Sequence, residues 1–225
     1  MVRDGWRAAT RADLRGLPAE VAPSLLGARL TTVVAGETVA VRVTEVEAYH
    51  GRDTGPVPDP GSHARMGPTA RNATMWGEPG HLYVYLSHGI HSCVNVVCGP
   101  AGVAGGVLLR AGEVLEGTDA ATRRRPAART PRDLARGPGR FGDAVGLRHP
   151  LHDGIDAITG APRHGAVARL ELLAEPLADV ASGPRVGVAG IAGTAAFPWR
   201  YWIPGDPTVS PFRWGRGARE VSEAT

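Results

Sequence analysis

The run Val39-Ala40-Val41-Arg42-Val43-Thr44-Glu45-Val46-Glu47-Ala48-Tyr49 has the alternation of a half-buried β-strand. In one continuous strand the three alternate valines share a face with the two glutamates and Tyr49. Same-face neighbours lie about 6.5–7 Å apart, so Glu47 and Tyr49 could hold a small planar substrate between a charge and a ring. Periodicity alone favours the alternative that the strand leaves the sheet after Val43 and the acids are solvated.

The segments around this run indicate a hairpin followed by a long loop. Gly36-Glu37 separates it from the apolar run 29–34, which predicts two paired strands. Residues 14–26 have a helical pattern interrupted by Pro18 and Pro23. Residues 50–80 are rich in Gly and Pro but carry several polar side chains. A loop of this length inside a compact domain is usually functional or disordered, and its polar content favours function.

The remainder predicts further strands and peripheral helices. Residues 82–87 and 93–98, joined around Gly89, predict a second hairpin. A strand over 107–111 puts Arg110 on the opposite face from its apolar neighbours. The other expected elements are a basic helix or mobile loop at 118–136, a helix at 140–146, short strands at 168–173, 185–188 and 199–203, and a frayed tail from 215.

The chain shows no repeat and no linker, so residues 1–225 are interpreted as one domain, with a core at about 20–212. The order of elements lacks the βαβ alternation of a parallel sheet. We therefore expect an α+β fold.

The composition narrows the possible class of protein and its cellular compartment. The 225 residues are 43% hydrophobic, which permits a real core, and no apolar run reaches the length of a membrane span. Two cysteines and no secretory leader predict a soluble protein of a reducing cytoplasm. All 25 basic residues are arginine, against 22 acidic residues. The positive excess is compatible with nucleic acid, and the lack of lysine excludes a side-chain Schiff base.

The usual motifs of metal and nucleophile chemistry are missing from the sequence. Three histidines and two cysteines lie between His81 and Cys98, but their spacing matches no common zinc pattern. There is no Gly-x-Ser-x-Gly elbow and, without lysine, no phosphate-binding P-loop. We expect neither a metal nor a cofactor. Acids, aromatic rings and arginines remain, which suit the binding and hydrolysis of something that stacks.

An ordered set of motifs resembles the alkyladenine (3-methylpurine) DNA glycosylase family, colinearly from about residue 20 to residue 212. The matching segments are Glu45–Tyr49, Ser62-His63, Arg71-Asn72, Met75-Trp76, Gly80–Tyr85, Gly89, Asn95, Val107–Ala111, Glu116-Gly117, Gly137–Gly139, Arg185–Val188 and Arg200–Trp202. The resemblance implies a single domain with a curved antiparallel sheet, flanking helices and a protruding hairpin.

By this resemblance Glu47 is the general base that activates the water attacking C1′ of the deoxyribose. Arg110 would place that water and favour the ionised form of Glu47. Glu45 would have a supporting role.

The resemblance also assigns a pocket for an extruded purine. Tyr49 would cover one face of the base, with His63 and Tyr85 on the other. Asn95 would crowd the exocyclic amino group of normal guanine, which gives specificity by exclusion. The backbone near His63 and Val188 would line the base edge.

At the hairpin tip this sequence departs from the family. His88 stands where many relatives carry a tyrosine wedge, and we expect it to fill the gap left by the flipped nucleotide less well. DNA phosphates would be contacted by the arginines of 123–140, among them Arg140, and by Arg71 and Arg200.

The implied function is a monofunctional DNA glycosylase for alkylated or deaminated purines such as 3-methyladenine, 7-methylguanine, hypoxanthine and ethenoadenine. Its partner would be damaged double-stranded DNA, bound by a monomer near the nucleoid and away from membranes. One alternative is a non-catalytic damage-binding module on the same scaffold. A small-molecule transferase or hydrolase that shares only the sheet is a second.

Overall fold

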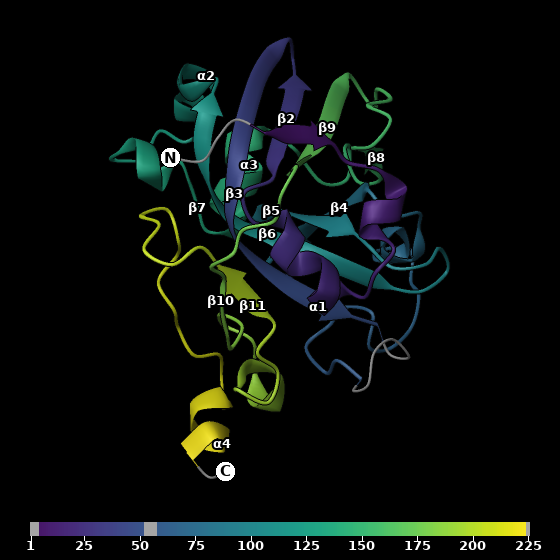
Figure 1. The fold of residues 1–225 in the computed structure, drawn as a ribbon, viewed down its shortest axis with the longest axis vertical. Helices are drawn as coiled ribbons and strands as arrows, with labels where there is room; N and C mark the ends of the chain where they lie inside the picture. The colour runs from purple at the N-terminus through teal and green to yellow at the C-terminus, as the bar shows by residue number, and fades with distance from the viewer. Residues whose placement is uncertain (1–4, 52–57, 224–225) are drawn as a thin grey trace.

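A computed structural model describes residues 5–51 and 58–223 (Figure 1). The strands of this part form one antiparallel sheet in the order β1-β9-β2-β3-β6-β5-β4-β8, with β7 beside β6 and β11 between β3 and β10. The strands are β1 (Trp6–Ala8), β2 (Arg29–Val34), β3 (Glu37–His50), β4 (His81–Ser87), β5 (His91–Val97), β6 (Gly105–Glu116), β7 (Ala135–Arg136), β8 (Ile155–Asp156), β9 (Ala166–Leu173), β10 (Ala181–Gly183) and β11 (Arg200–Trp202).

Short helices surround the sheet, so the expected α+β class with a curved antiparallel sheet is confirmed. In Figure 1, β2, β3 and β9 stand together at the top, β4, β5 and β6 cross below them, and β10, β11 and the yellow α4 lie at the bottom. The α-helices are α1 (Pro18–Val21), α2 (Thr118–Arg124), α3 (Pro138–Val145) and α4 (Ala218–Glu223); the 3₁₀ turns are η1 (Arg11–Leu14), η2 (Ala22–Leu25), η3 (Ala73–Trp76), η4 (Pro131–Asp133) and η5 (Gly190–Gly193).

Both expected hairpins are confirmed, as β2–β3 and β4–β5, and so is the strand that carries Arg110. The expected helix at 14–26 is broken into η1, α1 and η2, because Pro18 is the first residue of α1 and Pro23 the second residue of η2. The strand expected at 185–188 is wrong, since Gly187 (φ +71°) lies in a turn there. Helix α4 forms within the tail from residue 215 that we expected to be frayed.

A double irregularity in the β3–β6 pairing decides which side chains face the core. Val43 pairs with Gly112 and Val46 with Leu109, while Thr44 and Arg110 have no partner in the register between these strands. An extra residue in a strand turns the following side chains to the opposite face. The hydrophobic core accordingly contains Val39, Val41 and Val43, and then Val46 and Ala48.

This bulge corrects the expectation of one continuous face. Glu45 and Glu47 do not follow the valines into the core, and they do not run out into solvent either. Both carboxylates are fully buried on the other side of the sheet. There a smaller apolar cluster of Ala64, Met75, Tyr83, Val97 and Ala104 supports the long loop.

Helix α3 packs directly on β5. A side chain on Gly142 would lie 1.9 Å from the carbonyl oxygen of Ser92, so only glycine permits this approach. Phe141 next to it is fully buried in the main core. None of the helices described here is both long and apolar enough to cross a membrane.

Candidate active site

A cavity of about 660 Å³ opens between the β4–β5 hairpin, β6, the loop after β3 and the segment before η5. This volume lies within the range of small-molecule sites and would accept a purine nucleotide. Its lining contains eight of the residues expected from the sequence: Tyr49, His63, Arg71, Tyr85, His88, Asn95, Arg110 and Val188.

Glu47 lies directly behind the wall of this cavity. Its side chain is fully buried, and its oxygens accept hydrogen bonds from three residues that do line the cavity. Oε2 accepts from the Tyr49 hydroxyl at 2.8 Å and from Arg110 Nη1 at 3.3 Å, while Oε1 accepts from the backbone N–H of Val186 at 2.6 Å. Three donors, one of them a guanidinium, satisfy this buried carboxylate within the protein.

Glu45 forms a separate buried network. Its Oε1 accepts from Arg110 Nε at 3.0 Å and from Arg200 Nε at 2.7 Å, and its Oε2 accepts from the backbone N–H of Ser210 at 2.8 Å. All of its partners are protein groups that hold β3, β6 and β11 together. This arrangement fits the supporting role expected for Glu45.

Arg110 joins the two carboxylates, and it is the unpaired residue of the β6 bulge. Bulges commonly redirect a side chain near active sites. Burial opposes the charge of Arg110, but the attraction of Glu47 and Glu45 outweighs burial and raises its pKa above the usual value.

Aromatic rings line the cavity on more than one side. The ring of His63 meets Tyr85 edge-on at 4.6 Å between centroids, and Tyr85 stacks on Tyr83 at 5.4 Å. Burial and the charge of Glu47 raise the pKa of Tyr49 well above its usual value, so its hydroxyl is a neutral donor. Burial and two nearby arginines lower the pKa of His63, so this ring is uncharged at neutral pH.

Asn95 is held at the floor of the cavity. It lies on β5, is buried, and donates from Nδ2 to the carbonyl of Tyr83 at 3.1 Å. This bond fixes the orientation of the amide, as a residue that discriminates by crowding would require.

The hairpin tip lies at the cavity mouth and is exposed. His88 has a positive φ of 50°, and its Nδ1 lies 3.0 Å from the Ser87 hydroxyl. Arg71 donates to the carbonyl of Leu86 at 3.1 Å and is otherwise exposed. Arg140, on the first turn of α3, is also exposed.

The expectation for Arg200 is wrong. Its side chain is 6% exposed, and its guanidinium bonds Glu45 and the carbonyl of Ser210. It therefore cannot reach a phosphate. An arginine followed by two aromatic residues gives no sign in the sequence that it is buried against a distant carboxylate.

Two contacts around the cavity were not predicted from the sequence. Arg185 and Asp59 form a fully buried bidentate ion pair of 2.7 and 2.8 Å, and the guanidinium carbon of Arg185 lies 4.6 Å from the centroid of the Tyr49 ring. The second contact is the Val186 N–H on Glu47. A backbone donor leaves no signal in residue identity, and the ion pair joins residues 126 positions apart.

The thiols and histidines of the 81–98 region do not converge. Cys93 and Cys98 are buried and unpaired, and burial raises the pKa of Cys93 to about 11. Within residues 5–51 and 58–223, no group of three or more His, Cys, Asp or Glu has an arrangement that could hold a metal ion.

Comparison with known proteins identifies the family. The model of the family described as methylpurine-DNA glycosylase matches residues 13–207. A protein of Leifsonia xyli subsp. xyli named "Putative 3-methyladenine DNA glycosylase" is 54% identical over 198 residues, which cover 86% of this chain and 87% of that protein. Proteins with the same name from Nocardia farcinica and Mycobacterium leprae are 52% and 44% identical, over 92% and 87% of this chain and 92% and 85% of their own lengths. The chain belongs to the methylpurine-DNA glycosylase family, whose name describes DNA glycosylases for alkylated purines.

Proposed function

We propose that this protein takes a damaged purine out of duplex DNA into the cavity and hydrolyses its N-glycosidic bond. The observation that carries the proposal is the buried Glu47 carboxylate, whose three donors all come from residues that line the cavity. Glu47 accepts the proton of a water as the water oxygen bonds to C1′, and the C1′–N bond breaks. The bonding electrons leave with the base.

The charge of the base decides how readily it leaves. A purine alkylated at N3 or N7 is cationic and leaves as a neutral molecule. Hypoxanthine or an ethenoadenine must gain a proton as it leaves, so we expect slower excision of these lesions. Extrusion costs a few kcal/mol of stacking and pairing, which contacts with Tyr49, His63 and Tyr85 offset at about 1–3 kcal/mol per stacked base.

The product should be an intact abasic site. Strand cleavage by glycosylases proceeds through an amine nucleophile, and this chain has no lysine. Arg71 and Arg140, both exposed, are the residues we propose for phosphate contacts around the lesion.

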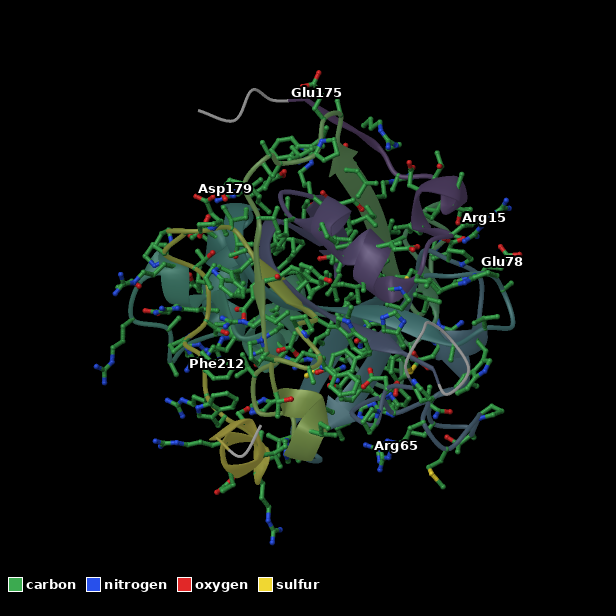
Figure 2. All side chains as sticks on the ribbon, turned by 60° about the horizontal axis from the view of Figure 1, so that its bottom comes forward. Arg15, Arg65, Glu78, Glu175, Asp179 and Phe212 are labelled. Carbon is green, nitrogen blue, oxygen red and sulfur yellow. The ribbon has the colours of Figure 1, made fainter. Side chains whose placement is uncertain are left out.

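The test is a panel of lesion duplexes with free base quantified under single turnover. Glu47→Gln should lower the excision rate about 10²–10⁴-fold. The matched control is Glu175→Gln, an exposed acid at the opposite end of the molecule from the cavity residue Arg65 in Figure 2, and it should match the wild type. A protein that binds lesion duplex, releases no base and is indifferent to Glu47→Gln would be a damage-binding module instead.

A further inference from the structure

The C-terminal strap, residues 212–216, reads Phe212-Arg213-Trp214-Gly215-Arg216 and begins five residues after the family match ends. Its two aromatic side chains are exposed to solvent: Phe212 is 37% exposed and Trp214 is 41% exposed. Their rings pack edge to face at 4.9 Å, so they form one ordered apolar surface. Alternating arginines and exposed rings are typical of a nucleic-acid contact.

The strap is fixed to the wall of the cavity. Its carbonyls at Arg213 and Arg216 accept hydrogen bonds of 2.9 Å from the N–H groups of Gly187 and Gly190. A side chain on Gly215 would lie 1.9 Å from the carbonyl oxygen of Val188, so the two segments are in direct contact. Gly187 and Val188 themselves line the cavity.

The charge on the strap points to an anionic partner. Arg213 and Arg216 are exposed, and within residues 5–51 and 58–223 neither side chain has an ion pair or hydrogen bond to an acid. Ile191, which is 51% exposed, lies on η5 immediately after Gly190, whose N–H is bonded to the strap. A protein partner would need complementary acids and a specific shape, whereas a DNA that delivers a nucleotide to this cavity must pass beside its wall.

We propose that the C-terminal strap binds the DNA backbone beside the lesion, with Arg213 and Arg216 on phosphates and the two rings against deoxyribose. This inference rests on the proposed function. The strap thereby extends the DNA contact of the chain beyond the part that the family model covers. It contributes to affinity, and it takes no part in bond cleavage.

The test measures the affinity for a labelled lesion duplex by anisotropy from 50 to 200 mM salt, together with the single-turnover excision rate at saturating DNA. For Arg213→Gln/Arg216→Gln we expect the slope of log affinity against log salt to become less steep by about 1.8. The loss of affinity between 50 and 200 mM salt then becomes about tenfold smaller. Arg213→Lys/Arg216→Lys should restore the slope. Trp214→Ala should bind about five- to tenfold more weakly. The excision rate should not change in any of them.

Arg15→Gln is the matched control, because this exposed arginine lies on the other side of the molecule from Phe212 in Figure 2. An unchanged slope in the double glutamine variant overturns the strap proposal. A lower excision rate with unchanged affinity also overturns it, since the strap would then only support the cavity wall. If the wild type neither binds nor excises lesions, the proposed function fails first, so the two failures are distinguishable.

Discussion

The hydroxyl of Tyr49 donates a 2.8 Å hydrogen bond to Oε2 of Glu47, so the ring proposed to cover the base is tied to the proposed general base. Arg110 occupies the same oxygen and Val186 N–H the other. A carboxylate offers about four lone-pair sites, and one is left on Oε1. A water that attacks C1′ must use that position or displace one of the donors.

Tyr49→Phe separates the ring from the hydroxyl. The ring should still stack on the base, so we expect single-turnover excision within about tenfold of the wild type. Loss of a hydrogen bond to a buried charge should lower the free energy of unfolding by about 1.5–3 kcal/mol. Tyr49→Ala should be much less active because it also loses the stacking surface. If Phe proves as inactive as Ala, the hydroxyl and not the ring is what excision needs.

Glu45→Gln should be a stability variant. It leaves Arg200 and Arg110 with less compensating charge in a buried network, and breaking such a pair costs about 3–5 kcal/mol. Urea denaturation of Glu45→Gln beside Glu113→Gln, an acid with a half-exposed side chain on the same strand pair, measures this. An unchanged urea midpoint would mean that the ion-pair network makes no net contribution to the free energy of unfolding.

His50 predicts how stability depends on pH. Its ring is buried against Trp199, neither nitrogen has a hydrogen-bond partner within residues 5–51 and 58–223, and burial lowers its pKa below the usual 6.5. The unfolded chain therefore takes up the proton first as the pH falls. The contribution of neutral His50 to the free energy of unfolding is therefore fully present above about pH 6.5. It is lost as the pH falls further, at up to about 1.4 kcal/mol per pH unit.

His50→Phe should reduce that slope, as followed by urea midpoints between pH 8 and pH 5. The pKa values of His63 and His152 are also lowered by burial, so part of the slope should persist. His88→Asn, at an exposed position with φ +50°, is the control and should keep the full slope. A His50→Phe slope equal to that of the wild type would contradict the assignment.

Asn95→Ala should relax discrimination. Removing the amide frees space beside the Tyr83 carbonyl, so we expect purines that keep a 2-amino group to be excised at least about tenfold better relative to hypoxanthine. The ratio of single-turnover rates on 7-methylguanine and hypoxanthine duplexes measures this. An unchanged ratio would place discrimination elsewhere in the cavity.

The sequence predicted much of this architecture because hairpins and alternating strands are local features. The β2–β3 and β4–β5 pairs follow from turn residues between apolar runs. The family resemblance then named eight residues that do line the cavity. What could not be predicted were long-range pairings of charge. The sequence around Arg200 does not indicate that its guanidinium lies 2.7 Å from Glu45. The position of Asp59 in a loop likewise does not indicate that it pairs with Arg185.

The bulge at Thr44 and Arg110 has a consequence for how this chain can change in length. Because the side-chain period of a strand is two, the unpaired Thr44 is what returns Val46 and Ala48 to the core side. One residue inserted between Glu45 and Val46 would swing Glu47 into the valine core and bring Val46 and Ala48 out to the cavity side. Substitutions there alter one contact, whereas this single-residue insertion exchanges the faces of the residues that follow it. We expect such changes to be rejected at this point of the chain even though nearby loops accept them.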